Sequence, residues 1–146
     1  MKVELKKFKP HQDLSEETLC FSAHIWIDGK PAGHVRNRGH GGSHDYDFTD
    51  PETRRTFETH ARKITGEAFD PMDDLIDRLI QGLEEVSIVK ANIRKGFLVT
   101  VLIQKGPYDI NGKTFYKDEY YVGIPHVKHV EALAKKHRAD QYRVVS

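Results

Sequence analysis

The stretch that decides the fold is LCFSAHIWIDGKPAGHVRN, residues 19–37. In its first half, apolar side chains alternate with polar or smaller ones. This period of two predicts a half-buried β-strand over residues 19–27. Asp28-Gly29 is a strong hairpin signal, so residues 32–37 are predicted to return as an antiparallel partner. The side chains expected on the core face are Leu19, Phe21, Ala23, Ile25 and Ile27, and those on the other face are Cys20, Ser22, His24 and Trp26.

The length of the turn sets which side chains of the return strand face the core. A two-residue turn pairs Ala23 with His34 and leaves Val35 on the polar face. A turn of odd length, with Gly29 in a left-handed bulge, returns Val35 to the apolar set, and we prefer it. This register also predicts that His34 and Arg36 share a face with His24 and Trp26.

Outward from the hairpin, strands and helices follow one another. Residues 3–8 alternate weakly and predict an edge strand. Asp50-Pro51 and Asp70-Pro71 each place an N-cap carboxylate before a proline, which predicts helices over 51–65 and from 71 to 94. Their apolar stripes are Phe57, Ala61 and Ile64 in the first helix, and Leu75, Ile76, Leu79, Leu83 and Val86 in the second.

The last third predicts further strands and one helix. Residues 97–103 are apolar on both faces and predict a central strand. Asn111-Gly112 predicts a hairpin turn into a strand at 119–124. A helix over 126–137 is expected to bury Val127, Val130 and Ala134, and residues 142–145 to return as a strand. The chain, residues 1–146, is therefore predicted to be a single α+β domain, with a mainly antiparallel sheet and two or three packed helices.

Composition narrows the class of protein. The 146 residues carry a net charge of +1, with 38% hydrophobic and 31% charged residues. The near-zero net charge gives no general attraction to nucleic acid or to an anionic membrane. One cysteine cannot form an internal disulfide, which favours the cytoplasm. No stretch has the apolar length of a membrane-spanning helix or the pattern of a secretory signal.

The loop RNRGHGGSHDY, residues 36–46, is the strongest candidate for a binding site. Its glycines, Gly39, Gly41 and Gly42, permit positive φ angles, in which successive amides can surround an anion. Arg36 and Arg38 would add donors suited to phosphate. The loop lacks the lysine of a P-loop, so a tight surface corner remains the alternative.

The same loop could instead hold a metal. His40, His44 and Asp45 offer imidazole and carboxylate ligands suited to a divalent ion, and they would support a small metal-dependent hydrolase. Neither cysteine pairs nor a His-Glu-x-x-His pattern accompanies them, so no cofactor is required by the sequence. Nucleophilic catalysis is not favoured either, because Cys20 and His24 lie about 13 Å apart along one strand.

Two surfaces suggest macromolecular partners. Lys6, Lys7 and Lys9 would join Arg36 and Arg38 in a basic patch if the first strand lies beside the hairpin, and Trp26 could then stack on a base. Charges elsewhere are balanced, so a nucleic-acid partner is not the favoured hypothesis. Aromatic residues on the later strands fit a protein interface, although an ordinary packed sheet face is the more common explanation. They are Tyr108, Phe115, Tyr116, Tyr120 and Tyr121.

Residues 13–46 resemble the N-terminal part of small uncharacterised proteins of bacteria and phages. The shared features are a Leu-Ser-Glu-Glu-Thr start at 14–18, a Gly-Lys hairpin turn at 29–30, and an Asn-x-Gly-x-Gly-Gly loop at 37–42. The resemblance covers about the first third of the chain and implies no catalytic residue. It implies a setting in which small proteins work by binding, either blocking a host defence factor or sequestering a small molecule.

Together these observations predict a non-enzymatic binding protein for an anionic, nucleotide-like ligand. The alternatives are a protein–protein module, such as an inhibitor of host defence, and the metal-dependent hydrolase. The predicted binding residues are His24, Trp26, His34, Arg36, Asn37, Arg38, Gly39, His40, Gly41, Gly42 and His44.

Overall fold

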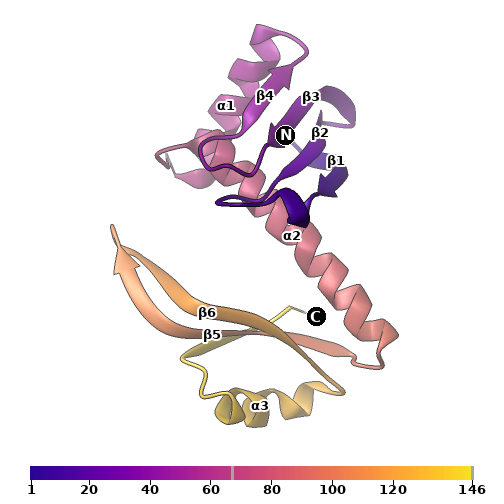
Figure 1. The fold of residues 1–146 in the computed structure, drawn as a ribbon, viewed down its shortest axis with the longest axis vertical. Coiled ribbons are helices and arrows are strands. Elements are labelled where there is room, and N and C mark those ends of the chain that lie inside the picture. The colour runs from indigo at the N-terminus through magenta and orange to yellow at the C-terminus, as the bar shows by residue number, and fades with distance from the viewer. Residues whose placement is uncertain (67, 146) are drawn as a thin grey trace. The chain divides into compact units, whose positions relative to one another are not determined.

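The computed structural model describes residues 1–66 and 68–145, and it has the predicted α+β class (Figure 1). All strand pairs are antiparallel, as expected. Contacts gather into two compact units, residues 1–81 and 82–146, with the long helix α2 (Pro71–Arg94) passing from one to the other. A single domain over the whole chain stays a prediction. None of the described helices is long and apolar enough to cross a membrane.

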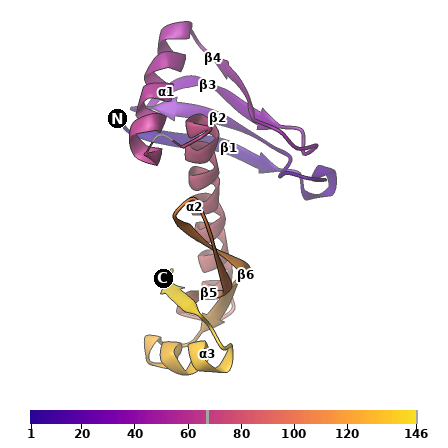
Figure 2. The same cartoon turned by 90° about the vertical axis from the view of Figure 1, so that its left-hand side faces the viewer.

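The first unit is a four-stranded meander in the order β1-β2-β3-β4, with two helices on one face (Figure 2). The expected edge strand is confirmed as β1. The helix α1 (Pro51–Thr65) begins at the predicted cap, where the Asp50 carboxylate accepts a hydrogen bond from the Thr53 amide. It ends at Gly66, which adopts a left-handed conformation with φ of 68°. The strands are β1 (Val3–Pro10), β2 (Phe21–Ile27), β3 (Lys30–Asn37) and β4 (Asp45–Phe48).

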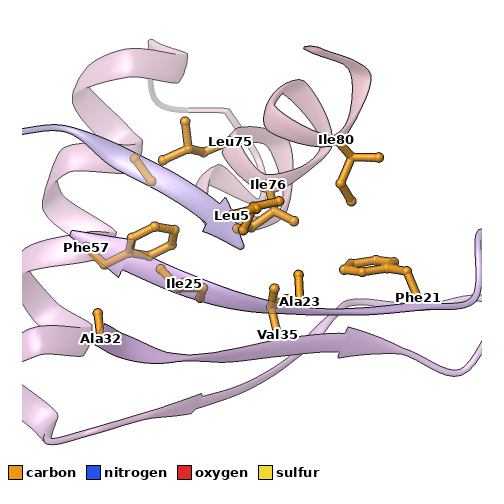
Figure 3. Close-up of a cluster of buried hydrophobic side chains, with 11 residues drawn as sticks. Leu5, Phe21, Ala23, Ile25, Ala32, Val35, Phe57, Leu75, Ile76 and Ile80 are labelled. Carbon is orange, nitrogen blue, oxygen red and sulfur yellow. The ribbon is translucent and has the colours of Figure 1, made fainter. Parts of the chain in front are cut away.

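The core of this unit joins the sheet to both helices (Figure 3). Phe57 of α1 and Ile76 of α2 are fully buried against Ile25 of β2. The apolar side chains that alternate along residues 21–27 therefore form the face that the helices cover, as predicted. Its buried members are Leu5, Phe21, Ala23, Ile25, Ala32, Val35, Phe57, Ala61, Leu75, Ile76 and Ile80.

The central hairpin has the predicted facing but a different irregularity. Val35 pairs with Ala23 and is buried, as preferred. The turn itself, however, is a two-residue turn with both Asp28 and Gly29 at positive φ. The register shift comes later, because Ile25 pairs with Gly33 while Trp26 pairs with Pro31, which leaves Ala32 as the extra residue. The bulge predicted at Gly29 is thus at the wrong position, but its predicted effect, which is to place Val35 on the core face, is confirmed.

The second unit is a three-stranded sheet in the order β6-β5-β7, with β5 central as predicted. Asn111-Gly112 forms the expected turn of a long hairpin. The short helices η2 (Val127–His129) and α3 (Val130–Lys136) replace the single helix predicted at 126–137. Val130 packs with Val101, Ile103 and Ile124 in a small core of its own. The strands are β5 (Val99–Ile110), β6 (Lys113–Ile124) and β7 (Gln141–Val144).

Several apolar side chains expected to be buried are exposed. Ile64 of α1 is 49% exposed, and Val127 at the start of η2 is 57% exposed. On α2, Leu75 and Ile76 are buried, whereas Leu83 and Val86 lie in the second unit and are exposed. A helical stripe is buried only where a sheet lies against it, and these positions fall at the ends or beyond the edge of such contacts.

Candidate functional site

The polar face of the first sheet gathers the charged and aromatic side chains of three strands. The cross-strand register aligns Lys9, Ser22 and Arg36 in one row and Lys6, His24 and His34 in the next. Because the apolar face of the sheet packs on the helices, these side chains point the other way. We call this surface the basic face and define it by Lys6, Lys7, Lys9, His24, Trp26, His34 and Arg36.

A hollow of about 240 Å³ lies on the basic face. Its lining includes Lys7, Lys9 and Arg36, which come from two strands separated by β2. Lys7 has a positive φ of 53° at the register shift between Lys6 and Lys9. Lys6 and Lys9 are three residues apart, so strict alternation would place them on opposite faces, and this irregularity lets both face the same side as their partners on β2.

Two histidines line this hollow. The rings of His24 and His34 lie 4.2 Å apart, centroid to centroid, across the β2–β3 pair. Partial desolvation and the nearby charges of His34, Lys7 and Lys9 lower the pKa of His24. An anionic ligand would neutralise the lysines that contribute to this lowering of the His24 pKa.

Trp26 supplies the aromatic surface beside the histidines. It is half-buried, and the Lys6 ammonium lies over its ring at 3.9 Å from the centroid. This is the distance of a cation–π contact. The sequence predicted both a stacking surface here and a basic patch if the first strand lay beside the hairpin, and the β1–β2 pairing satisfies that condition.

Carboxylates mark the border of the basic face at the edge strand β4. Asp45 lies opposite Arg36, and Asp47 lies opposite His34. A second hollow of about 200 Å³ lies between these four side chains. Residues 1–81 contain more acidic than basic side chains, so the basic face is a local segregation of charge rather than a consequence of overall composition.

The glycine loop has a different character, because its polar groups bond within the protein. Asn37 is only 4% exposed and stands at the centre. Its Oδ1 accepts hydrogen bonds from the Gly39 amide at 2.8 Å and from the Thr18 hydroxyl at 2.7 Å. Its Nδ2 donates to the Gly42 carbonyl and to Nδ1 of His44. One buried amide side chain thus closes the loop on itself.

The loop also interlocks with residues 14–18. The Gly39 carbonyl accepts hydrogen bonds from the amides of Glu16 and Glu17, and the Gly41 amide donates to Thr18 Oγ1. A Cβ at Gly39 would lie 2.5 Å from the Leu14 carbonyl oxygen, which is closer than real Cβ contacts come. Two of the three motifs on which the resemblance rests, at 14–18 and 37–42, therefore contact each other and form one structural element.

The surroundings of the loop are acidic. His44 Nε2 donates to Asp77 at 2.8 Å, and the His44 amide and the Tyr46 hydroxyl both donate to Asp73. Burial opposes a charge on His44, but the Asp77 hydrogen bond and the neighbouring carboxylates outweigh it and raise its pKa. The amide of Asn37 favours the neutral ring, since it donates to Nδ1. The amides of Gly39 and Gly41 are already engaged, and these carboxylates repel an anion.

The predicted metal ligands are not brought together. His40 pairs with Glu16 at 2.9 Å, His44 pairs with Asp77, and Asp45 lies on β4 opposite Arg36. Among residues 1–66 and 68–145, no group of three or more His, Cys, Asp or Glu side chains is placed to hold a metal ion. Cys20 is buried behind the loop, and its amide donates to Ser15 Oγ.

The predicted aromatic cluster divides between several roles in the second unit. Tyr120 packs on the small core and bonds to His137, while the Tyr121 hydroxyl donates to Glu85 of α2. Tyr116 bonds to Gln141 of the following strand. Tyr108 and Phe115 stack on each other near the hairpin tip, and both are about two-fifths exposed. Tyr116, Tyr120 and Tyr121 therefore bond within the second unit, whereas Tyr108 and Phe115 contact each other and stay partly exposed.

The predicted site thus divides into two parts. His24, Trp26, His34 and Arg36 share the basic face, whereas Asn37, Gly39, Gly41, Gly42 and His44 belong to the interlocked loop. Arg38 and His40 lie in the loop and are exposed. The sequence predicts Lys6, Lys7 and Lys9 only as a basic patch that depends on strand pairing, and they are not among the predicted binding residues. Comparisons with protein-family models, curated proteins and solved structures find no match.

The loop's structural role predicts opposite outcomes for two of its residues. Asn37→Ala leaves the Gly39 amide and the Thr18 hydroxyl without their buried acceptor, and should lower the free energy of unfolding by about 2–4 kcal/mol. His40→Ala removes only an exposed pair and should leave it nearly unchanged. Urea denaturation of both variants measures the difference. Equal, small effects would contradict the structural role of Asn37.

Proposed function

We propose that this protein binds an anionic, nucleotide-like ligand on the basic face of its first sheet. The observation that carries the proposal is the convergence of Lys7, Lys9 and Arg36 on one hollow that the His24–His34 pair also lines. Three strands contribute to it, and the charge is opposite in sign to the excess on residues 1–81. A ligand with phosphate groups would neutralise these cations, and a planar base would find Trp26 within the same surface.

The glycine loop supports this site without taking part in it. Arg36 precedes Asn37 directly, so the bonds that fix Asn37 also fix the end of β3. The proposal therefore keeps the nucleotide-like ligand expected from the sequence and moves it from the loop amides to the sheet. The function proposed is binding, because the face offers cations and rings that suit an anionic ligand with a planar group.

Removing the cations should weaken binding of a phosphate ligand. In the triple variant Lys7→Gln, Lys9→Gln, Arg36→Gln, we expect the Kd for ATP, measured by isothermal titration calorimetry without added metal, to rise at least about tenfold. The matched control is Lys113→Gln, Lys117→Gln, Lys128→Gln, which removes the same charge from exposed positions of the second unit. An equal loss of affinity in both variants would mean that binding is a general charge effect, and would contradict the proposal.

Binding should also strengthen as the pH falls. An anion would stabilise the protonated imidazole of His24, whose pKa the free protein holds below its ordinary value, so a proton is taken up on binding. The ATP affinity of the native protein divided by that of the variant His24→Gln should be about 5-fold greater at pH 5.5 than at pH 7.5. Using this ratio cancels the ligand's own titration. A ratio that stays constant would contradict proton uptake at His24.

A further inference from the structure

The basic face is open and shallow, which limits what it can hold. Its two hollows measure about 240 Å³ and 200 Å³. Sites that enclose a small molecule usually have volumes of about 300–1,000 Å³ and bury most of the ligand's surface. A mononucleotide would therefore leave much of its own surface in water here, and a longer anionic chain could use more of the face.

Cations and rings follow one another across this face. The row that contains Arg36 and Lys9 lies at one end, the His24–His34 pair lies next to it, and Trp26 lies beyond. Ser22, in the first row, and Trp26 are four residues apart on β2, or about 13 Å. An extended ligand that carries both phosphates and planar groups matches this series, whereas a compact anion would use only the first part of it.

This order of cations and rings favours a single-stranded nucleic acid over a duplex. Bases offer their faces for stacking only when they are unpaired, and aromatic side chains on a cationic surface are the usual means of binding them. The cations Lys6, Lys7 and Lys9 lie on β1 and Arg36 lies on β3. Asp45 and Asp47 bound them at β4, and Glu4 of β1, which pairs with Lys2, lies opposite Trp26. The cationic strip is thus about two strand spacings, or 10 Å, across, which suits one sugar–phosphate backbone.

Lys6 links the two kinds of contact. Its ammonium covers the Trp26 ring at 3.9 Å and is held by a flexible side chain that is exposed to solvent. A base that stacks on the indole would displace this ammonium toward the adjacent phosphate, so the ring and the charge would serve neighbouring groups of the same strand.

From these observations we propose that the ligand of the basic face is single-stranded nucleic acid, with phosphates on Lys7, Lys9 and Arg36 and a base stacked on Trp26. This inference rests on the proposed function, since it names the polymer to which the nucleotide-like ligand belongs. It adds two requirements that anion binding alone does not make, namely a contribution from the indole and a preference for a strand over a mononucleotide.

The test uses the full chain and a fluorescein-labelled 15-nucleotide oligothymidylate, followed by fluorescence anisotropy. We expect binding at least about tenfold tighter than that of ATP, and a slope of log K against log salt of about −3 for phosphate contacts with Lys6, Lys7, Lys9 and Arg36. The variant Lys7→Gln, Lys9→Gln, Arg36→Gln should reduce the magnitude of this slope to about 1 or less, the share of Lys6. The control Lys113→Gln, Lys117→Gln, Lys128→Gln should leave slope and affinity unchanged.

The indole is tested separately from the charges. Trp26→Leu should weaken oligonucleotide binding about fivefold or more without changing the salt slope, and Trp26→Phe should restore part of the affinity. Circular dichroism and urea denaturation of each variant confirm that the fold is kept. Loss of affinity in Trp26→Leu without partial rescue by Trp26→Phe would overturn the assignment of stacking to this ring.

The remaining outcomes separate the two proposals. If ATP binds on the basic face and the oligonucleotide binds no tighter, the inference fails and the proposed function stands. If neither ligand binds, both fail. If the same sequence binds more tightly as a duplex with its complement than as a single strand, the polymer assignment is overturned although the basic face is retained.

Discussion

The register of the β2–β3 hairpin decides which of its side chains face the core, and the rest of the structure depends on this register. Because side chains alternate along a strand, a shift of one residue would exchange the core and solvent faces of β3. The extra residue at Ala32 prevents this exchange, since it lets a two-residue turn at Asp28-Gly29 coexist with Val35 in the core. The same shift turns His34 and Arg36 toward the solvent. Packing and the basic face are thus two consequences of one register.

The second constraint is the buried side chain of Asn37, which ends β3. It satisfies groups from Thr18, Gly39, Gly42 and His44, so residues 14–18 and the glycine loop are held as one element. Carboxylates at the start of α2 then bind His44 and Tyr46. At Gly39 the positive φ angle serves a close approach to the backbone of Leu14, and we propose that the loop supports the neighbouring strand rather than opening toward a ligand.

Much of the fold could be predicted because its signals are local. Pro51 and Pro71 mark where α1 and α2 begin, Asp50 caps the first of these helices, and the Asp-Gly and Asn-Gly pairs fix both hairpin turns. The position of the bulge could not be found this way, because several placements give the same facing of Val35. Exposure of Leu83 and Val86 was also missed, since a helical stripe does not tell which part of a long helix has a sheet beside it.

The candidate site was predicted only in part, for a related reason. The alternation of β2 and β3 was sufficient to place His24, Trp26, His34 and Arg36 on one face. Whether Lys7 and Lys9 join them depends on strand pairing between distant segments, and on an irregularity at Lys7 that alternation does not predict. The sequence alone favours an anion site on the glycine loop, because glycines that open a backbone to a ligand and glycines that let two segments touch have the same sequence signature.

We propose that the basic face binds the ligand and that the glycine loop is a scaffold. Nuclear magnetic resonance of the ¹⁵N-labelled protein, titrated with ATP, distinguishes these two places directly. We expect shifts of the Trp26 indole, the imidazoles of His24 and His34, and the amides of β1 to β3, with the amides of Gly39 and Gly41 little changed. Shifts concentrated at Gly39 and Gly41, with Trp26 unmoved, would contradict this proposal and return the site to the loop.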